Sequence, residues 1–234
     1  GYPKFLRDTA VTKIDDNTWK AELTDSWNIG GVANGGYSMA TAARALSEAL
    51  EHKDPLSITG HYLSRVEPGK AELEIEKLNI GRSVSTALLK FIQGGEERIR
   101  FTSCFTDFSK SKGDTLREVE APNFPPIEDC IHMPYIKGFT PVLEKQIDRK
   151  FAPYSNWWDE ERPRDRASLD AYYAWPGGEA IDLFSVIFFL DTMSPPIFNR
   201  LGSRGWVPSL ELTMHLKQAP SPGPLKMRGK TDFV

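Results

Sequence analysis

The sequence is poor in the residues that bind metals or form disulfide frameworks. It has two cysteines and four histidines among 234 residues, and their spacings do not fit a zinc site. We therefore expect no metal ion. Cys104 and Cys130 are interpreted as free thiols of a reducing compartment, with one disulfide between them as the less favoured alternative.

Long apolar runs and an excess of basic charge are also missing. The most apolar stretch, Ile181–Leu190, is far shorter than the roughly 20 residues of a membrane span. The N-terminal segment lacks the apolar core of a signal peptide. Acidic residues number 32 against 29 lysines and arginines, so the net charge is −3. These absences predict a soluble, cytoplasmic protein with neither a membrane nor a nucleic-acid partner.

Several catalytic and phosphate-binding motifs are absent as well. The sequence has no GxSxG nucleophile elbow, which argues against an α/β-hydrolase. It has no GxGxxG or GxxxxGK[ST] loop for a nucleotide phosphate. We therefore expect no cofactor, and any chemistry would depend on water and protein groups.

The first hundred residues predict an antiparallel sheet and one long helix. Apolar residues recur at helical spacing over Gly35–Lys53, with Asn34 as the N-cap. Before and after this helix, the apolar residues recur with the period that is typical of strands. The predicted strands are Ala10–Ile14, Thr18–Leu23, Ser57–Val66, Ala71–Ile80, Val84–Ile92 and Arg98–Asp107.

The second half repeats this pattern in outline. Residues 1–109 are predicted to form a first domain, residues 110–141 a proline-rich linker or covering segment, and residues 142–234 a second domain. The last domain is expected to be incomplete at its C-terminus, because fewer strands follow its helix. Its predicted elements are strands Val142–Pro153 and Leu169–Trp175, helix Ile181–Met193, and strands Ser209–Lys217 and Leu225–Val234.

Five short motifs follow one another along the chain. They are Asn34-Gly35-Gly36-Tyr37, His61–Val66 before Pro68-Gly69, Gly81-Arg82-Ser83, Leu190-Asp191 before Pro195-Pro196, and Trp206–Leu212. In their order and spacing they resemble the thioesterase II-like (TesB-like) acyl-CoA thioesterases. The resemblance covers most of the chain outside residues 109–165.

The resemblance implies an α+β fold, a tandem (double) hot-dog. In each unit an antiparallel sheet would wrap around a long central helix. The implied activity is hydrolysis of an acyl-CoA thioester to the free acid and CoA, a reaction of fatty acid metabolism. A homodimer or a larger homo-oligomer is compatible with this family.

Asp191 is the most informative candidate for catalysis. It follows an almost wholly apolar segment, where a carboxylate is costly unless a pocket or partner compensates it. The resemblance implies that Asp191 orients a water or takes its proton, and that Ser209, where the family usually has threonine, helps to hold that water. The alternatives are a solvent-facing Asp191 and a surface hydroxyl at Ser209. The family's catalytic glutamine would lie beyond Val234, and Gln218 does not replace it.

The helix start supplies the other candidates. Free N–H groups of Gly35 and Gly36 could hold a developing oxyanion, although glycines also allow close packing. Asn34 would cap the helix and touch the ligand. His61 is a pocket candidate, although a histidine on a strand more commonly has a structural role. Arg82 is a candidate contact for the phosphates of CoA, which arginine binds well. The alternative is that Arg82 is a solvent-exposed cation in a turn.

Two other functions are compatible with the same fold. A non-catalytic acyl-CoA-binding protein would keep the pocket without the chemistry. The position of the Asp191 side chain distinguishes it from an enzyme, since a solvent-facing or ion-paired carboxylate would favour binding. An acyl-CoA hydratase or dehydratase is less favoured, because the expected spacing of glycine and proline after a histidine is absent around His52 and His61.

Overall fold

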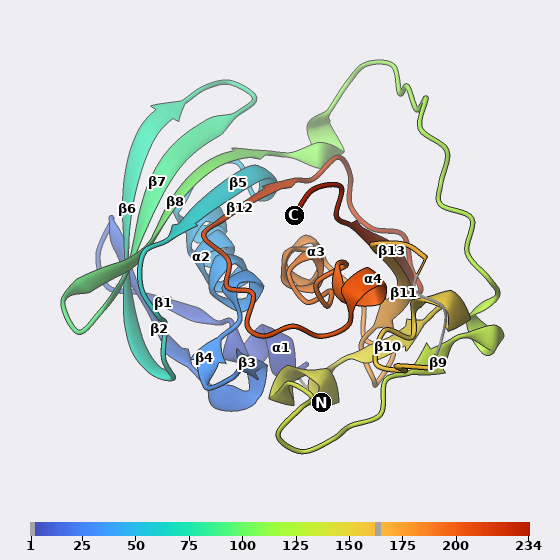
Figure 1. The fold of residues 1–234 in the computed structure, drawn as a ribbon. Coiled ribbons are helices and arrows are strands. Elements are labelled where there is room, and N and C mark those ends of the chain that lie inside the picture. The colour runs from blue at the N-terminus through green and yellow to red at the C-terminus, as the bar shows by residue number, and fades with distance from the viewer. Residues whose placement is uncertain (1–2, 162–164) are drawn as a thin grey trace. The chain divides into compact units, whose positions relative to one another are not determined.

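The computed structural model describes residues 3–161 and 165–234 (Figure 1). These residues form two compact units, each assembled from separate segments of the chain. The first comprises Gly1–Lys112, Ile181–Asp191 and Ser209–Ser221; the second comprises Gly113–Ala180, Thr192–Pro208 and Pro222–Val234. The domain limits 1–109, 110–141 and 142–234 stay a prediction.

The first unit contains a seven-stranded sheet in which every neighbouring pair is antiparallel. The strand order is β1-β2-β6-β7-β8-β5-β12, so β12, which comes much later in the sequence than the other six strands, forms one edge of this sheet. The bounds are β1 Val11–Lys13, β2 Thr18–Leu23, β5 Asp54–Tyr62, β6 Gly69–Ile80, β7 Ser85–Gln93, β8 Glu96–Thr106 and β12 Glu211–His215.

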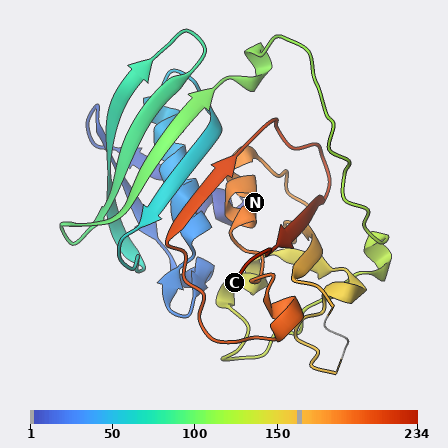
Figure 2. The ribbon, with the colours of Figure 1, turned by 45° about the horizontal axis from the view of Figure 1, so that its top comes forward.

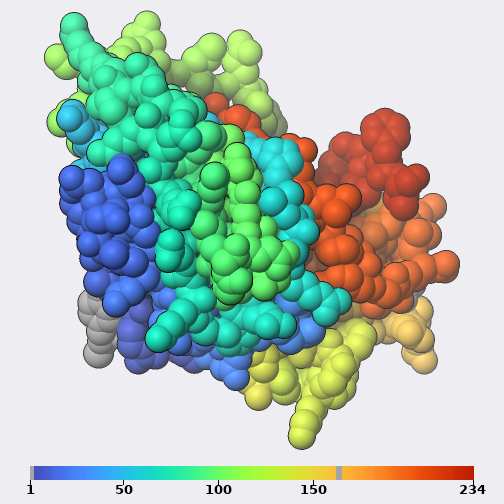
Figure 3. Space-filling model, turned by 90° about the vertical axis from the view of Figure 1, so that its left-hand side faces the viewer, coloured from blue at the N-terminus to red at the C-terminus, as the bar shows by residue number. Residues whose placement is uncertain are grey.

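The sheet has one buried and one exposed face, as its alternating sequence predicts. In β6, the buried side chains are Ala71, Leu73 and Ile75, and the residues between them are exposed. Figure 3 looks onto the side of the molecule where the teal to green strands of this sheet lie. The β7–β8 hairpin turns at Gly94 and Gly95, both with positive φ, as a two-residue turn of this kind requires.

Helix α2 (Gly35–Ala49) packs against the buried face of the sheet, in contact with β5, β6, β7 and β8 (Figures 1 and 2). Helix α3 (Leu183–Leu190) packs beside α2 in the same unit. The unit also contains α1 (Lys4–Asp8) and the two-stranded ribbon of β3 (Asn28–Ile29) and β4 (Val32–Ala33).

The second unit is built on a four-stranded antiparallel sheet in the order β13-β11-β10-β9. Its elements are β9 Ile131–His132, β10 Asp148–Phe151, β11 Ser168–Ala174, α4 Phe198–Leu201 and β13 Leu225–Lys230. The prediction of one strand over Val142–Pro153 is wrong in its first part, because Val142–Gln146 forms a 3-10 helix after Pro141. A long central helix in each unit is not confirmed, since α4 has four residues.

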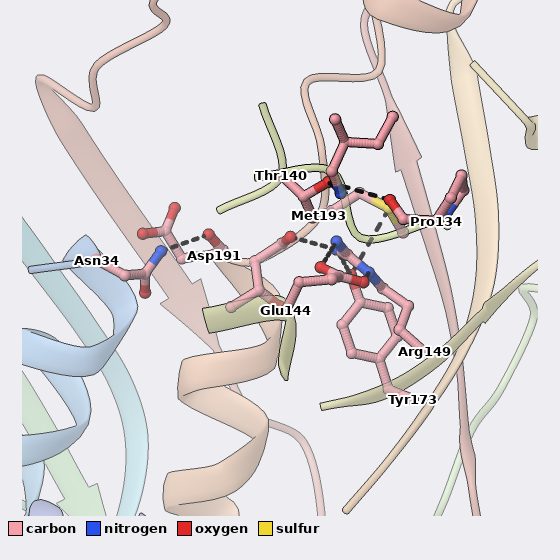
Figure 4. Close-up of polar contacts among 10 residues, drawn as sticks. Asn34, Pro134, Thr140, Glu144, Arg149, Tyr173, Asp191 and Met193 are labelled. Atoms are coloured by element: carbon pink, nitrogen blue, oxygen red, sulfur yellow. Dashed lines mark hydrogen bonds and ion pairs between the residues drawn. The ribbon is translucent and has the colours of Figure 1, made fainter. Parts of the chain in front are cut away.

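A buried polar cluster centred on Arg149 stabilises the second unit (Figure 4). The guanidinium donates to both carboxylate oxygens of Glu144, to the Tyr173 hydroxyl at 2.9 Å and to the Thr192 carbonyl. The Arg149 side chain is 2% exposed and that of Glu144 is 9% exposed. A charge this deeply buried is tolerated because its donors are paired.

Two further features concern the cysteines and the lengths of the helices. Cys104 and Cys130 are both free. In residues 3–161 and 165–234, no helix has the length and apolar character needed to cross a membrane.

Candidate active site

The candidate site lies where the start of α2 meets the end of α3, inside the first unit. Asp182 is the N-cap of helix α3, and its carboxylate accepts the Ser185 N–H. Asp191 is the C-cap of the same helix. Helix α2 begins after Asn34. A helix start carries unpaired N–H groups and a helix end carries unpaired carbonyls, so each end can satisfy the other.

Asn34 joins these two helix ends. Its Oδ1 accepts the Tyr37 N–H at 3.0 Å, which confirms the predicted N-cap. Its Nδ2 donates at 3.0 Å to the backbone carbonyl of Asp191, one of the unpaired carbonyls at the end of α3 (Figure 4). Asn34 is 4% exposed. This side chain therefore fixes the backbone of Asp191 as well as the start of α2.

The Asp191 carboxylate accepts a backbone hydrogen bond from α2. Gly36 N–H donates to Asp191 Oδ2 at 2.8 Å. Burial raises the pKa of Asp191 from 3.8 to about 6, and the hydrogen bond from Gly36 opposes that rise. Asp191 has no ion pair with the described residues. The pKa of this carboxyl group therefore lies near the pH at which a general base works well.

Glycine at positions 35 and 36 allows Asp191 to approach the helix start. A Cβ on Gly36 would lie 2.8 Å from Asp191 Cβ and 3.0 Å from the Phe188 carbonyl oxygen. A Cβ on Gly35 would lie 2.9 Å from Asp191 Oδ2 and 3.0 Å from the Tyr62 ring. Gly36 N–H is occupied by the carboxylate, whereas Gly35 N–H meets no acceptor within the described chain.

Replacing Gly36 by alanine is expected to destabilise the protein by about 1–2 kcal/mol and to lower any activity that depends on Asp191. Alanine favours a helix over glycine by up to about 1 kcal/mol. Overpacking typically costs about 1–3 kcal/mol, and here the new Cβ meets backbone and a β-carbon that cannot swing away. Urea denaturation of the parent and the variant measures the difference.

Gly177→Ala is the matched control for that measurement. A Cβ at Gly177 would meet atoms of the exposed Glu179 carboxylate, the closest at 2.6 Å. That side chain can rotate away, so we expect a change within about 0.5 kcal/mol. Equal effects of the two substitutions would contradict the close packing at Gly36.

Tyr62 belongs to this site, although within the motif His61–Val66 only His61 was named as a site candidate. Its hydroxyl donates to the Gly35 carbonyl at 2.8 Å. Strand alternation directs Tyr62 towards α2 and His61 to the opposite face, where His61 is exposed and its Nε2 lies 3.9 Å from Glu211 Oε2. The alternation of the strand was the signal that could have identified Tyr62.

Arg82 and Ser209 are not brought into contact with Asp191. The Arg82 carbonyl lies 3.2 Å from Nε2 of His52, which follows the C-terminal end of α2, so Arg82 is at the far end of that helix from Gly35. Ser209 is exposed, and no hydrogen bond joins it to Asp191 in the described residues. The next residue, Leu210, accepts the Tyr62 N–H at 3.0 Å. Both roles stay predictions.

The described part of the chain offers no group of three or more histidine, cysteine, aspartate or glutamate side chains placed to hold a metal ion. The chemistry that this arrangement can perform is that of one carboxylate beside a helix start. Asp191 can take a proton from a bound water. The free Gly35 N–H, at the positive end of the helix dipole, can stabilise negative charge on an oxygen.

Two family models match the chain. The acyl-CoA thioesterase N-terminal domain matches residues 23–106, and the acyl-CoA thioesterase C-terminal domain matches residues 127–234. A thioesterase-like protein of Talaromyces wortmannii, TwmA, is 35% identical over 94 residues, which are 39% of this chain. The matched region spans 27% of the length of that relative.

Solved structures share the fold over nearly the whole chain. A candidate thioesterase II of Thermobifida fusca YX superposes with a TM-score of 0.89 at 27% identity, over 99% of this chain and 87% of its own. A hot-dog protein of unknown function from Alicyclobacillus acidocaldarius gives a TM-score of 0.85 at 16% identity, over 98% and 87%. The acyl-CoA thioesterase II TesB2 of Mycobacterium marinum gives 0.72 at 13% identity, over 93% and 81%. These neighbours establish a hot-dog fold with antiparallel sheets.

Proposed function

Because this chain belongs to the thioesterase II-like (TesB-like) acyl-CoA thioesterase family, we propose that it hydrolyses an acyl-CoA thioester to the free acid and CoA. The observation that carries the proposal is the Asp191 carboxylate, which is half-buried, free of ion pairs with the described residues and bound to Gly36 N–H, and whose pKa burial raises to about 6. A non-catalytic acyl-CoA-binding protein would have no need of such a carboxylate.

Asp191 acts as the general base in the proposed reaction. With Oδ2 held by Gly36, Oδ1 takes a proton from a water while that water attacks the thioester carbonyl carbon. The new C–O bond places negative charge on the carbonyl oxygen, which Gly35 N–H stabilises. One such donor is typically worth about 3–4 kcal/mol of barrier. The C–S bond then breaks, and Asp191 returns the proton to the sulfur of CoA.

Ser209 is proposed as a second contact for the attacking water. Its hydroxyl has no partner among the residues that the structure describes. The neighbouring Leu210 is tied to β5 through Tyr62. His61 and Arg82, as ligand contacts, and a homo-oligomer remain predictions that need their own tests.

The proposed mechanism fixes the sign of the pH dependence. Asp191 must be ionised to accept a proton, and its pKa is raised to about 6. We therefore expect kcat/KM to rise with pH through about 6 and then to level off. A pH profile of kcat/KM between pH 4.5 and 8 measures this limb. A rate that falls over the same interval would contradict the assignment of Asp191 as base.

The test of function is release of free thiol from acyl-CoAs of different chain length, followed with a chromogenic thiol reagent. The parent and Asp191→Asn are compared at one pH, and a blank without substrate subtracts the reaction of Cys104 and Cys130, which are both free. We expect the parent to hydrolyse at least one acyl-CoA and the variant to lose about a hundredfold or more.

Each other outcome corrects a different claim. If both proteins release thiol equally, the chain is a thioesterase but Asp191 is not its base. If neither releases thiol above the blank while acyl-CoA binds, the proposed hydrolysis is wrong and the chain is an acyl-CoA-binding protein.

A further inference from the structure

Two hydrogen bonds at the start of α2 use opposite ends of one peptide group. The Tyr62 hydroxyl donates to the Gly35 carbonyl at 2.8 Å. Gly36 N–H donates to Asp191 Oδ2 at 2.8 Å. The Gly35 carbonyl and the Gly36 N–H are joined by the same planar peptide bond, so neither can turn without the other.

We propose that Tyr62 is a positioning residue, whose hydroxyl fixes the Gly35–Gly36 peptide and thereby strengthens the hydrogen bond from that peptide to Asp191. The proposal rests on the proposed function only in taking Asp191 as the base. The effect on Asp191 is a property of the folded chain and is measurable without substrate.

The surroundings of Tyr62 hold its ring against the helix start. The ring contacts Gly35 closely enough that a Cβ there would lie 3.0 Å away. Its other side meets Phe101 edge to face, with centroids 6.4 Å apart. Burial, with the charge of Asp191 adding to it, raises the pKa of Tyr62 well above its ordinary value. The hydroxyl therefore stays protonated, and remains a donor, over the whole working range of pH.

The hydrogen bond that Tyr62 donates to the Gly35 carbonyl favours the ionised form of Asp191. A donor at a peptide carbonyl polarises the group and makes its N–H a stronger donor, a cooperative gain of about 10–30% per bond. A stronger N–H bond stabilises the ionised carboxylate over the protonated one. Within the described residues, the pKa of Asp191 is set by burial, which raises it, and by Gly36 from α2, which lowers it. The charge of Asp191 in turn raises the pKa of the Tyr62 phenol from β5, and no lysine, arginine or histidine side chain of these residues pairs with Asp191.

The test substitution is Tyr62→Phe, which keeps the ring and removes the hydroxyl. We expect the titration midpoint of the Asp191 carboxyl, followed by carbon-13 NMR of selectively labelled protein, to move upward by about half a pH unit. The acid limb of the kcat/KM profile should move by the same amount. The loss of activity should then be largest below pH 6 and smaller at pH 8.

Tyr37→Phe is the matched control, because it also removes a buried hydroxyl from the same unit. The Tyr37 hydroxyl donates to the Asp8 carbonyl at 2.8 Å and accepts the Thr24 N–H, so neither of its hydrogen bonds involves Asp191 or the Gly35–Gly36 peptide. We expect Tyr37→Phe to lower stability and to leave the Asp191 midpoint unchanged. An equal shift in both variants would mean general loosening of the structure and would overturn the proposal.

The two proposals fail in different ways. If the parent hydrolyses acyl-CoA but Tyr62→Phe leaves both the NMR midpoint and the acid limb in place, Tyr62 is a packing residue only. If the parent hydrolyses nothing, the proposed function fails. The NMR titration then decides by itself whether Tyr62 acts on Asp191.

Discussion

Replacing Asp191 by asparagine is expected to make the protein more stable at pH 8 while it removes the activity. The substitution conserves volume, and the amide oxygen can still accept the Gly36 N–H that Asp191 Oδ2 now accepts at 2.8 Å. What it removes is a buried charge that no ion pair with the described residues compensates. Stability and activity therefore change in opposite directions at this residue, as expected where a site is strained for its function.

The size and pH window of this effect follow from the pKa of Asp191. Burial raises it from 3.8 to about 6, so between these values the folded protein binds a proton that the unfolded chain has lost. Stability falls as pH rises through this window, by about 3 kcal/mol in total. Asparagine has no such loss. We expect Asp191→Asn to be about 2–3 kcal/mol more stable than the parent at pH 8 and equally stable near pH 4.

Thermal or urea denaturation of parent and variant at pH 4 and pH 8 measures this difference. At pH 8, the gain corresponds to a rise of roughly 4–10 °C in Tm. Asp114→Asn is the control, because Asp114 is exposed. This substitution should leave the stability unchanged at both pH values. A gain of the same size at both pH values would contradict burial of the charge as the cause.

Local sequence signals predicted most of the first unit. The alternation of Ala71, Leu73 and Ile75 against charged residues identified β6. The change from a period of two to a helical period located α2, with Asn34 as its cap. These signals were reliable because each is decided by residues within one turn or one strand of each other.

Pairings between distant segments were beyond the reach of such signals. Nothing in Glu211–His215 says that this strand pairs with β5, about 150 positions earlier in the chain. Helix α3 likewise packs beside α2 because its apolar faces are buried there, and no short motif encodes that choice. Tertiary contacts of this kind are set by the whole core, so they appear only in the folded structure.

The candidate site shows the same division. The motif at residues 34–36 and Asp191 were found in sequence, and the structure brings them together through Gly36 and Asn34. Sequence analysis named His61 as a pocket candidate and did not name Tyr62, yet the pleat of β5 turns Tyr62 towards α2. The role of His61 as a ligand contact stays a prediction, whereas the alternation of the strand places Tyr62 at the start of α2.

Replacing Arg149 by methionine is expected to cost about 3–5 kcal/mol, the largest loss of stability predicted for this chain. The change would leave Glu144, whose side chain is 9% exposed, with a buried charge and no guanidinium. It would also remove the donors to the Tyr173 hydroxyl and to the Thr192 carbonyl. The cost comes mainly from the groups left unpaired rather than from the ion pair itself.

A double variant separates these causes. Arg149→Met combined with Glu144→Leu removes both charges and fills the space with apolar groups, which is often close to neutral for a buried pair. We expect the double variant to recover more than half of the loss, as measured by urea denaturation of the parent, both single variants and the double. If the losses of the two single variants simply add in the double, Arg149 and Glu144 are not coupled. In that case the second unit is stabilised by packing around Arg149 and its ring contacts with Phe151 and Tyr173.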